Sequence, residues 1–216
     1  MSLTLYYHPL SSYCWKALIA FYESEAPFRP HIVDLGDEAA AAAFKEIWPM
    51  GRFPVLRDEK RNHLVPESSI IIEYLAQHYP GGSGLVPADA DLARQTRFHD
   101  RFFDNYVMTP VQKVVFDRIR PAGRKDPHGV EEACALLDTA LSMVDAAMEK
   151  RTWAMGDAFT MADCAAAPSL YYAEKVAPFA GKHESAARYL DRLKARPSFA
   201  RVLKEAEPYA HFFPEE

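Results

Sequence analysis

In the first eighty residues of the chain, short stretches typical of β-strands alternate with stretches typical of helices. The strand-like runs are LTLYY at 3–7 and PHIVDL at 30–35, and helical patterns follow at 12–23 and in an alanine-rich segment that ends at Trp48, before Pro49. A parallel pair of strands needs a crossover of a dozen or more residues, which this spacing supplies. The β-α-β-α order therefore predicts an α/β unit at the start of the chain.

Two further strand-like runs, FPVLRD at 53–58 and HLVPE at 63–67, are joined by the polar turn EKRN. So short a connection predicts an antiparallel hairpin. A helical pattern at 68–78 completes the unit, and Pro and Gly then cluster in YPGGSGLVPADAD, which is typical of a linker. We therefore predict a first domain at 1–80 and a linker at 81–88.

Residues 89–216 show helical patterns and no convincing strand, so we expect an all-helical second domain. Thr160 is the expected N-cap of one helix, with Asp163 three residues later able to bond back to it as a capping box. The predicted fold class is an α/β domain followed by an all-α domain. The expected helices are 90–119, 129–150, 161–176, 184–195 and 199–205.

Composition excludes several classes of function. The formal net charge of -5 argues against a surface for nucleic acid or an anionic membrane. No run approaches the roughly 18 apolar residues of a membrane span, and the start of the chain lacks the pattern of a signal peptide, so we expect a cytoplasmic protein. The three cysteines and eight histidines show neither a disulfide framework nor the spacing of metal ligands, so no metal is expected.

The stretch PLSSYCWK places Ser11 and Ser12 at the start of a helix, with Cys14 three residues after Ser11. Redox proteins carry two cysteines at this spacing, and an alcohol in place of the first cannot form a disulfide. The serines could simply cap the helix. Cys14 could be acidified by the helix N-terminus, but it shares a helix face with Leu18 and Phe21, where a cysteine is usually an inert hydrophobic residue.

A serine at this position can also hold the sulfur of a bound thiol as a thiolate. A free thiol has a pKa of about 8.5, and lowering it to about 6.5 requires roughly 2.7 kcal/mol. A hydroxyl that donates to a thiolate contributes roughly 1.5 to 3 kcal/mol. A helix N-terminus adds roughly 0.3 to 1 kcal/mol. One serine at the start of this helix is therefore sufficient.

The order of elements resembles that of the cytosolic glutathione transferases, whose first domain is thioredoxin-like. Four stretches carry the resemblance: P-L-S-S at 9–12, P-M-G-R-F-P-V-L at 49–56, E-S at 67–68 and F-T-M-A-D at 159–163. Together they imply a homodimeric, cytoplasmic detoxification enzyme that uses glutathione as co-substrate and attacks a small hydrophobic electrophile, with no nucleic-acid or membrane partner.

The resemblance assigns the catalytic hydroxyl to Ser11, with Ser12 at the alternative position. Tyr7 is a third candidate, because tyrosine-type relatives carry the hydroxyl at the end of this strand. Without the resemblance, Tyr7 would be interpreted as a buried strand residue.

The resemblance also implies the residues that bind glutathione. Phe53 would pair its backbone with the cysteinyl part, before a cis peptide bond to Pro54. Arg52 would meet the glycine carboxylate, although an exposed arginine is the alternative interpretation. Glu67 and Ser68 would hold the γ-glutamyl end, a helix N-terminus being suited to an anion. The alternative for this pair is helix capping.

The second substrate is expected against the helical domain, where Phe103, Tyr106 and Met108 and the aromatic tail PYAHFFPEE at 208–216 are candidates. Two other functions stay open. The Trp15–Lys16 pair after the serines is similar to the zeta class and suggests a glutathione-dependent isomerase or lyase. Some relatives of this fold are non-catalytic interaction modules.

Overall fold

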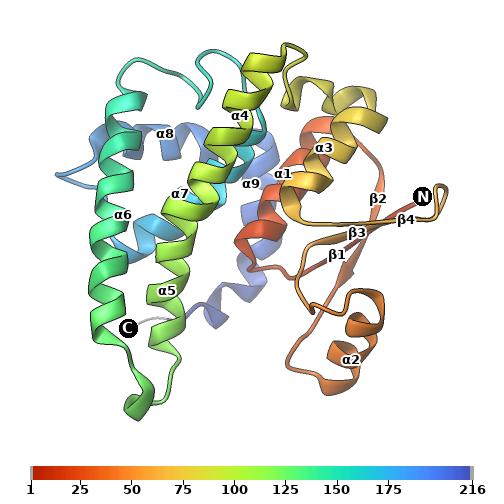
Figure 1. Cartoon of the computed structure of the whole chain (residues 1–216), viewed down its shortest axis with the longest axis horizontal. Helices are drawn as coiled ribbons and strands as arrows, with labels where there is room; N and C mark the ends of the chain where they lie inside the picture. Colours follow the sequence, from red (N-terminus) through yellow and green to blue (C-terminus); the bar gives the residue numbers. More distant parts are fainter. Residues whose placement is uncertain (1, 215–216) are drawn as a thin grey trace.

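The computed structural model describes residues 2–214 and shows an α/β half packed against a helical half (Figure 1). Met1, Glu215 and Glu216 lie outside the described residues. The division into 1–80, 81–88 and 89–216 stays a prediction. The first half consists of β1 (Leu3–Tyr7), α1 (Ser12–Ser24), β2 (Phe28–Ile32), α2 (Glu38–Ile47), β3 (Val55–Asp58), β4 (His63–Pro66) and α3 (Ser68–His78).

The four strands form one sheet in the order β2-β1-β3-β4. β1 pairs with β2 in parallel, and the β1–β3 and β3–β4 pairs are antiparallel, which confirms the parallel unit and the hairpin. β2 begins at Phe28 and ends at Ile32, so the strand predicted at 30–35 is placed too late along the chain. Pro30 pairs with Leu5. The sheet tolerates this proline because β2 is an edge strand, where a missing N–H costs no ladder bond.

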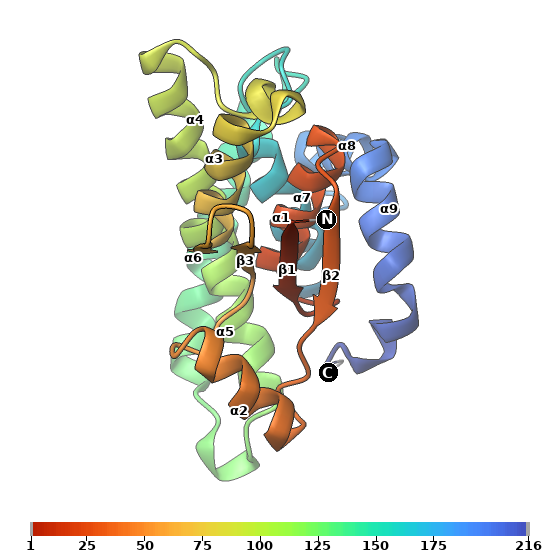
Figure 2. The ribbon, with the colours of Figure 1, turned by 90° about the vertical axis from the view of Figure 1, so that its right-hand side faces the viewer.

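The two faces of the sheet are covered by different helices (Figure 2). Leu3 and Leu5 of β1 belong to the large core shared with α1 and α3. Tyr6, one residue on, packs instead with Phe44 of α2 and Val55 of β3 in a smaller cluster. This alternation is the two-residue period of a strand. The sheet therefore has α1 and α3 on one face and α2 on the other.

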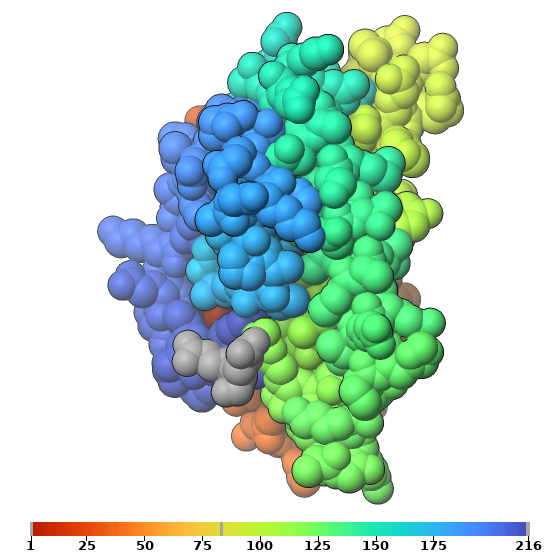
Figure 3. All heavy atoms as spheres, turned by 90° about the vertical axis from the view of Figure 1, so that its left-hand side faces the viewer, coloured from red at the N-terminus to blue at the C-terminus, as the bar shows by residue number. Residues whose placement is uncertain are grey.

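The second half consists of helices joined by loops, and among its described residues the β-structure is limited to an isolated bridge between Trp153 and Gly156. Seen from the side in Figure 3, it forms nearly the whole visible surface and leaves little of the first half in view. Its α-helices are α4 (Ala90–Phe102), α5 (Thr109–Arg118), α6 (Pro127–Met148), α7 (Met161–Val176), α8 (Glu184–Ala195) and α9 (Pro197–Ala206). Shorter turns of 3-10 helix lie at Pro80–Leu85, Ala122–Arg124 and Glu207–Phe212.

The single helix predicted at 90–119 is interrupted. A π-helical segment, Phe103–Met108, separates α4 from α5. Pro110 follows it, and a proline has no N–H to donate to the carbonyl four residues earlier and clashes with that carbonyl. The wider π turn accommodates this defect, and the Thr109 hydroxyl donates to Asp104 O at 3.0 Å. The extra residue in the π turn changes which residues of α5 share a helix face with those of α4.

α1 lies between the sheet and the helical half, which contacts it through α7 and α9. Cys14, Leu18 and Phe21 are buried, as their shared face predicts, and Trp15 is buried on the other side. Its indole ring packs against the rings of Tyr171, Tyr172 and Phe199. α1 is therefore buried all round, a burial that is typical of a central helix.

The N-terminus of α7 carries the predicted capping box, in which Thr160 and Asp163 exchange bonds. Asp163 also accepts hydrogen bonds from the backbone N–H of Ala154 at 2.8 Å and from the Tyr189 hydroxyl at 2.6 Å. Burial raises the pKa of Asp163, while these donors act to lower it. The prediction is confirmed, and the carboxylate has a structural role.

Candidate functional site

A cleft of about 820 Å³ lies where the two halves meet. Its size is that of a site for a small organic ligand. One wall comes from the loops at the ends of the strands and the N-termini of α1 and α3, and the other comes from α5, Tyr172 and the end of the chain. On the sheet side it is lined by His8, Leu10, Ser11, Ser12, Tyr13, Leu35, Trp48, Gly51, Arg52, Phe53, Pro54, Glu67 and Ser68.

Ser11 is the N-cap of α1, and its hydroxyl oxygen accepts a hydrogen bond from Cys14 N at 3.3 Å. This capping uses a lone pair of the oxygen and leaves the O–H free to donate elsewhere. Ser11 is half-buried and lines the cleft, and Ser12 lines it too but is buried. Capping and donation to a ligand are therefore compatible roles for one serine.

Cys14 sits beneath this serine in the core. It is fully buried, and its sulfur accepts a contact from His8 N at 3.4 Å. Burial raises the pKa of the Cys14 thiol to about 12, although the Ser11 hydroxyl acts to lower it. Such a thiol is neutral near pH 7 and packs as a small hydrophobic residue. Tyr7 is not among the residues that line the cleft, and burial raises the pKa of its phenol.

The peptide bond between Phe53 and Pro54 is cis, which confirms the geometry that the family resemblance implies. The paired residues of β3 begin at Val55 on both sides of that strand, so Phe53 lies beyond both ladders. Arg52 is exposed at the rim of the cleft. The backbone of Phe53 and the guanidinium of Arg52 therefore lie at the same cleft.

α3 begins beside this segment with an unusual residue. Glu67 is its N-cap and has φ 73° and ψ 124°, and no side chain caps the helix. A positive φ costs a non-glycine residue roughly 1 to 3 kcal/mol and is concentrated at functional sites. The first amides of the helix are left without a side-chain acceptor, which suits them to an anionic ligand. Ser68 is the first of these residues and also lines the cleft.

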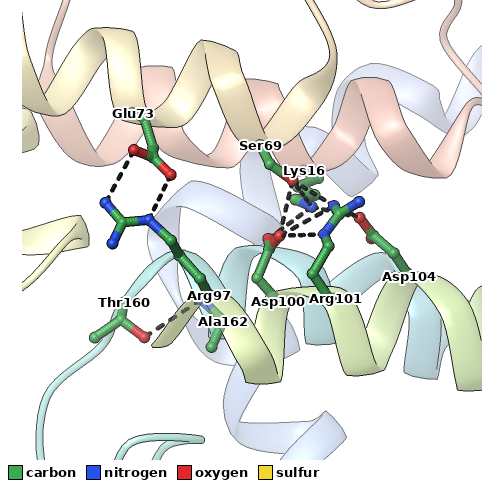
Figure 4. A network of polar contacts seen from close by, with 9 residues as sticks. All are labelled: Lys16, Ser69, Glu73, Arg97, Asp100, Arg101, Asp104, Thr160 and Ala162. Atoms are coloured by element: carbon green, nitrogen blue, oxygen red, sulfur yellow. Dashed lines mark hydrogen bonds and ion pairs between the residues drawn. The ribbon is translucent and has the colours of Figure 1, made fainter. Parts of the chain in front are cut away.

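A buried network of charges joins α1 and α3, whose N-termini line the cleft, to the helical half (Figure 4). Lys16 of α1 is 1% exposed, and its Nζ lies 2.6 Å from Asp100 Oδ1 and 2.7 Å from Asp104 Oδ2. It also donates to Ser69 Oγ at 2.8 Å. Arg101 contacts both carboxylates from the outer side. The network ties α1 and α3 to α4 and the π-helical segment.

Burial raises the pKa of the Asp104 carboxyl, and Asp100 raises it further, while Lys16 and Arg101 act to lower it. Sequence reasoning did not identify this network. The signal for it was a lysine within the apolar stretch of α1 and two aspartates four residues apart on one helix face.

His8 is a cleft residue that sequence reasoning also missed, although it directly follows β1. Its ring stacks on Phe53 with centroids 5.6 Å apart, and its Nδ1 accepts a hydrogen bond from Leu10 N at 3.2 Å. Burial lowers the pKa of His8, while Asp34 acts to raise it. Since Nδ1 is an acceptor, the neutral ring carries its proton on Nε2.

The helical wall includes Met108 but neither of its two predicted partners. Phe103 is 3% exposed in the core and lies at a separate pocket of about 180 Å³ between α4 and α6. Tyr106 is 47% exposed and lies two residues from Met108, which turns it to another helix face. The predicted tail does reach the cleft. The wall is formed by Met108, Val111, Gln112, Val115, Phe116, Ile119, Tyr172, Phe212, Phe213 and Pro214.

Among residues 2–214, no group of three or more His, Cys, Asp or Glu side chains is placed to hold a metal ion. In the same range, no helix has both the length and the apolar character needed to cross a bilayer.

The protein has a first domain of thioredoxin-like type, with a mixed four-stranded sheet, followed by a helical domain. A cleft lies at the junction of the two. The models of the glutathione S-transferase N-terminal and C-terminal domains match residues 5–83 and 107–197. The chain belongs to the glutathione S-transferase family.

Individual relatives resemble the chain over nearly its whole length. Glutathione S-transferase GstB of Escherichia coli (strain K12) is 25% identical over 206 residues, covering 93% of this chain and 97% of GstB. FtsZ-localized protein A of Caulobacter vibrioides is 27% identical, covering 95% and 92%. A glutathione S-transferase of Methylobacillus flagellatus KT, solved with GSH bound, superposes with a TM-score of 0.85 at 25% identity, covering 93% and 98%.

Proposed function

We propose that this protein is a glutathione transferase that activates the thiol of glutathione with Ser11 and conjugates it to a small hydrophobic electrophile. The observation that carries the proposal is the composition of one cleft. The Ser11 hydroxyl, at the N-terminus of α1, shares that cleft with an apolar wall from α5 and the chain end. Support also comes from the GstB relative and from the M. flagellatus enzyme, which was solved with GSH bound.

Each end of the glutathione zwitterion has a complementary group in the cleft. The N-terminus of α3 at Ser68 receives the γ-glutamyl carboxylate, and Glu67 receives the ammonium group. The backbone of Phe53, next to cis-Pro54, pairs with the cysteinyl residue, and Arg52 attracts the glycine carboxylate at the rim. These contacts position the sulfur at the N-terminus of α1.

At this position the Ser11 O–H donates to the sulfur and favours the thiolate, and the thiol proton passes to water. The thiolate then forms a carbon–sulfur bond to the electrophile. The displaced electron pair leaves with a leaving group or moves into a conjugated oxygen. A hydrogen bond to a charged group contributes roughly 1.5 to 3 kcal/mol, and the helix N-terminus adds roughly 0.3 to 1 kcal/mol. Together these cover a shift of about two pKa units.

The experiment compares Ser11→Ala with Ser12→Ala, because the two neighbouring serines differ in burial and are a matched pair. We expect Ser11→Ala to lower kcat/KM for a chlorinated dinitroarene roughly 10- to 100-fold. The pH at which the rate rises, which reports the pKa of the bound thiol, should move from about 6.5 toward about 8.5. Glutathione affinity, measured by calorimetry at about pH 5.5, where the bound thiol is protonated in both proteins, should stay within about twofold. Ser12→Ala should behave like the wild type.

Two results would count against this assignment. Full activity in Ser11→Ala would remove the serine from the mechanism, and an equal loss confined to Ser12→Ala would move the role to Ser12. As a binding control, Glu67→Gln should weaken glutathione affinity and leave the pH–rate inflection in place, because Glu67 meets the ammonium group and not the sulfur.

An interaction module is the second candidate, favoured by the likeness to FtsZ-localized protein A, whose name records a location and no reaction. Failure to bind glutathione in calorimetry would favour it. The zeta-like isomerase or lyase has weaker support. The Trp15–Lys16 pair that suggested it is buried in core contacts, since Trp15 stacks on Tyr172 and Lys16 joins the charge network.

A further inference from the structure

A second, smaller pocket, of about 180 Å³, lies between α4 and α6. Its lining side chains come from α4 and the first residue of the π-helical segment, from α6, and from the turn after α6 at Arg151 and Ala154. None of these residues lines the cleft at the junction of the two halves. The pocket is therefore a separate concavity, and a ligand bound in it leaves the cleft free.

The inner part of this pocket is apolar and has the size of a single aromatic ring. Phe102, Phe103, Val144 and Met148 line it and are buried. A cavity of about 150 Å³ with a similar apolar lining binds benzene. The pocket is slightly larger, so it has room for one aromatic ring that carries a small substituent.

Two large apolar side chains at the pocket are left in contact with solvent. Phe98 and Met143 line it from α4 and α6, and each is 55% exposed. The Phe98 ring lies 6.4 Å from that of Phe102, which in turn meets the Phe103 ring edge to face at 5.7 Å. A bound ring can extend this set of contacts, because aromatic pairs favour such spacings. Exposed apolar groups gathered at a concavity are typical of a ligand site.

The electrostatic character of the pocket is positive. Arg151 and His99 are its titratable lining residues, and no carboxylate among the described residues lines it. Arg151 makes no ion pair with any of residues 2–214. Burial lowers the pKa of His99, and the positive charge of Arg151 lowers it further. A concavity with apolar walls and charge of one sign attracts ligands of the opposite sign.

The guanidinium of Arg151 is suited to a carboxylate in particular. Its Nη1 donates to Ala154 O at 3.1 Å, which holds the side chain beside the pocket and leaves other N–H donors of the planar fork available. Such a fork binds a carboxylate through two parallel hydrogen bonds. Arg151 is exposed, so a carboxylate bound to it stays at the solvent edge and loses little hydration while the attached ring enters the pocket.

We propose that the pocket between α4 and α6 binds a small aromatic carboxylate of the size of benzoate, with the ring against Phe98, Phe102 and Met143 and the carboxylate on Arg151. His99 is near enough to the same carboxylate end to donate a further hydrogen bond. This binding site goes beyond the proposed transferase function and does not depend on it, because the pocket and the cleft share no lining residue.

The test compares 4-fluorobenzoate with 4-fluorobenzamide, which has nearly the same shape and no charge. Fluorine NMR titration of the full chain measures both affinities. We expect the benzoate to bind with a Kd below about 1 mM. The benzamide should bind roughly 3- to 10-fold more weakly, a range that allows for the exposure of Arg151 to water. Equal affinities, or no binding of the benzoate, would overturn the inference.

Variants of Arg151 locate the carboxylate. Arg151→Met keeps an unbranched side chain and removes the charge, so it should weaken the benzoate roughly 3- to 10-fold and change the benzamide by less than about twofold. Arg151→Lys keeps the charge without the planar fork and should retain part of the affinity for the benzoate. Unchanged affinity for the benzoate in Arg151→Met would contradict the assignment.

Two further variants separate this pocket from the cleft. Ala147→Phe places a ring in the pocket and should abolish binding of both compounds, provided that its melting temperature matches the wild type. Arg52→Gln removes the cation at the rim of the cleft and should leave the affinity for the benzoate unchanged. Loss of the benzoate in Arg52→Gln, with full affinity in Arg151→Met, would place the compound in the cleft and overturn the inference.

A second copy of the chain is the other possible occupant of this apolar surface. Sedimentation and NMR titration at protein concentrations that differ by roughly 100-fold distinguish the two. Equal affinity for the benzoate across that range, whatever the oligomeric state, supports an open pocket. Binding that disappears as a dimer forms would show that the partner copy covers the pocket, and it would overturn the proposal for the assembled protein.

Discussion

Replacing Lys16 with methionine tests the charge network that joins the two halves. Lys16 Nζ lies within 3 Å of Asp100 Oδ1, Asp104 Oδ2 and Ser69 Oγ. Methionine fills much of the same space but leaves two buried carboxylates facing one another. Arg101, whose side chain is half exposed, remains to balance one of them.

Removing one partner of a buried ion pair costs about 3 to 5 kcal/mol, because the other charge stays buried without compensation. A domain is stable by only about 5 to 15 kcal/mol, so this is a large fraction of the total. With a urea dependence of roughly 3 kcal/mol per M, the unfolding midpoint of Lys16→Met should fall by roughly 1 M or more.

Arg97→Gln is the matched control, drawn beside the network in Figure 4. Arg97 forms a two-bond ion pair with Glu73 at 2.7 and 3.0 Å, but its side chain is 46% exposed. An exposed pair contributes less than about 1 kcal/mol. The double variant Lys16→Met/Asp104→Asn removes the uncompensated charge and should recover part of the stability lost in Lys16→Met.

The pH dependence of the loss gives a second check. Removing Lys16 removes a cation that acts to lower the pKa of Asp104, which burial already raises. A carboxyl whose pKa is higher folded than unfolded binds its proton more tightly in the folded state, so its contribution to stability is present at acid pH and is lost as pH rises. The deficit of Lys16→Met should therefore be smaller at about pH 5 than at about pH 8. A loss no larger than that of Arg97→Gln, at every pH, would refute the reasoning.

Two further predictions concern groups outside the cleft. In the native protein near neutral pH, iodoacetamide should modify Cys134, which is exposed, and spare Cys14 and Cys164, which are buried and whose pKa values burial raises. Mass spectrometry of the intact chain would show one adduct, and adducts at all three before unfolding would contradict it. Asp163→Ala should destabilise the fold by about 3 kcal/mol or more in urea, because bonds to a charged group contribute roughly 1.5 to 3 kcal/mol each and the buried Tyr189 hydroxyl loses its acceptor. A loss below about 1 kcal/mol would limit the role of Asp163 to helix capping.

Local signals in the sequence predicted the bounds of an element where two of them agreed. The helix at 161–176 has its predicted bounds, because a capping box at Thr160 coincides with the start of a periodic pattern. The strand predicted at 30–35 lies at 28–32, so its start was placed two residues late and Pro30 lies inside the strand. Whether a proline ends a strand or lies within it depends on which strands pair beside it, and the sequence does not show that pairing.

Part of the cleft was predictable because its sheet-side segments carry local sequence patterns. The segments around Ser11, Phe53 and Glu67 have recognisable local patterns, and the structure brings them to one cleft. The burial of Lys16 and the position of Gln112 follow instead from how two halves pack and from the register shift at Phe103–Met108. Contacts of that kind join residues far apart in the sequence, as the pair of Lys16 and Asp104, 88 positions apart, shows.

The position of α1 links the proposed activity to the contact between the two halves. This thirteen-residue helix has Ser11 as its N-cap, and it carries Trp15, which stacks on Tyr172, and Lys16, which belongs to the charge network between the two halves. Separation of the two halves of the protein would therefore break these contacts of α1 and open the cleft between the sheet side and the helical wall. The proposed transferase activity should therefore be lost when heat, a denaturant or a competing surface separates the two halves, before either half unfolds.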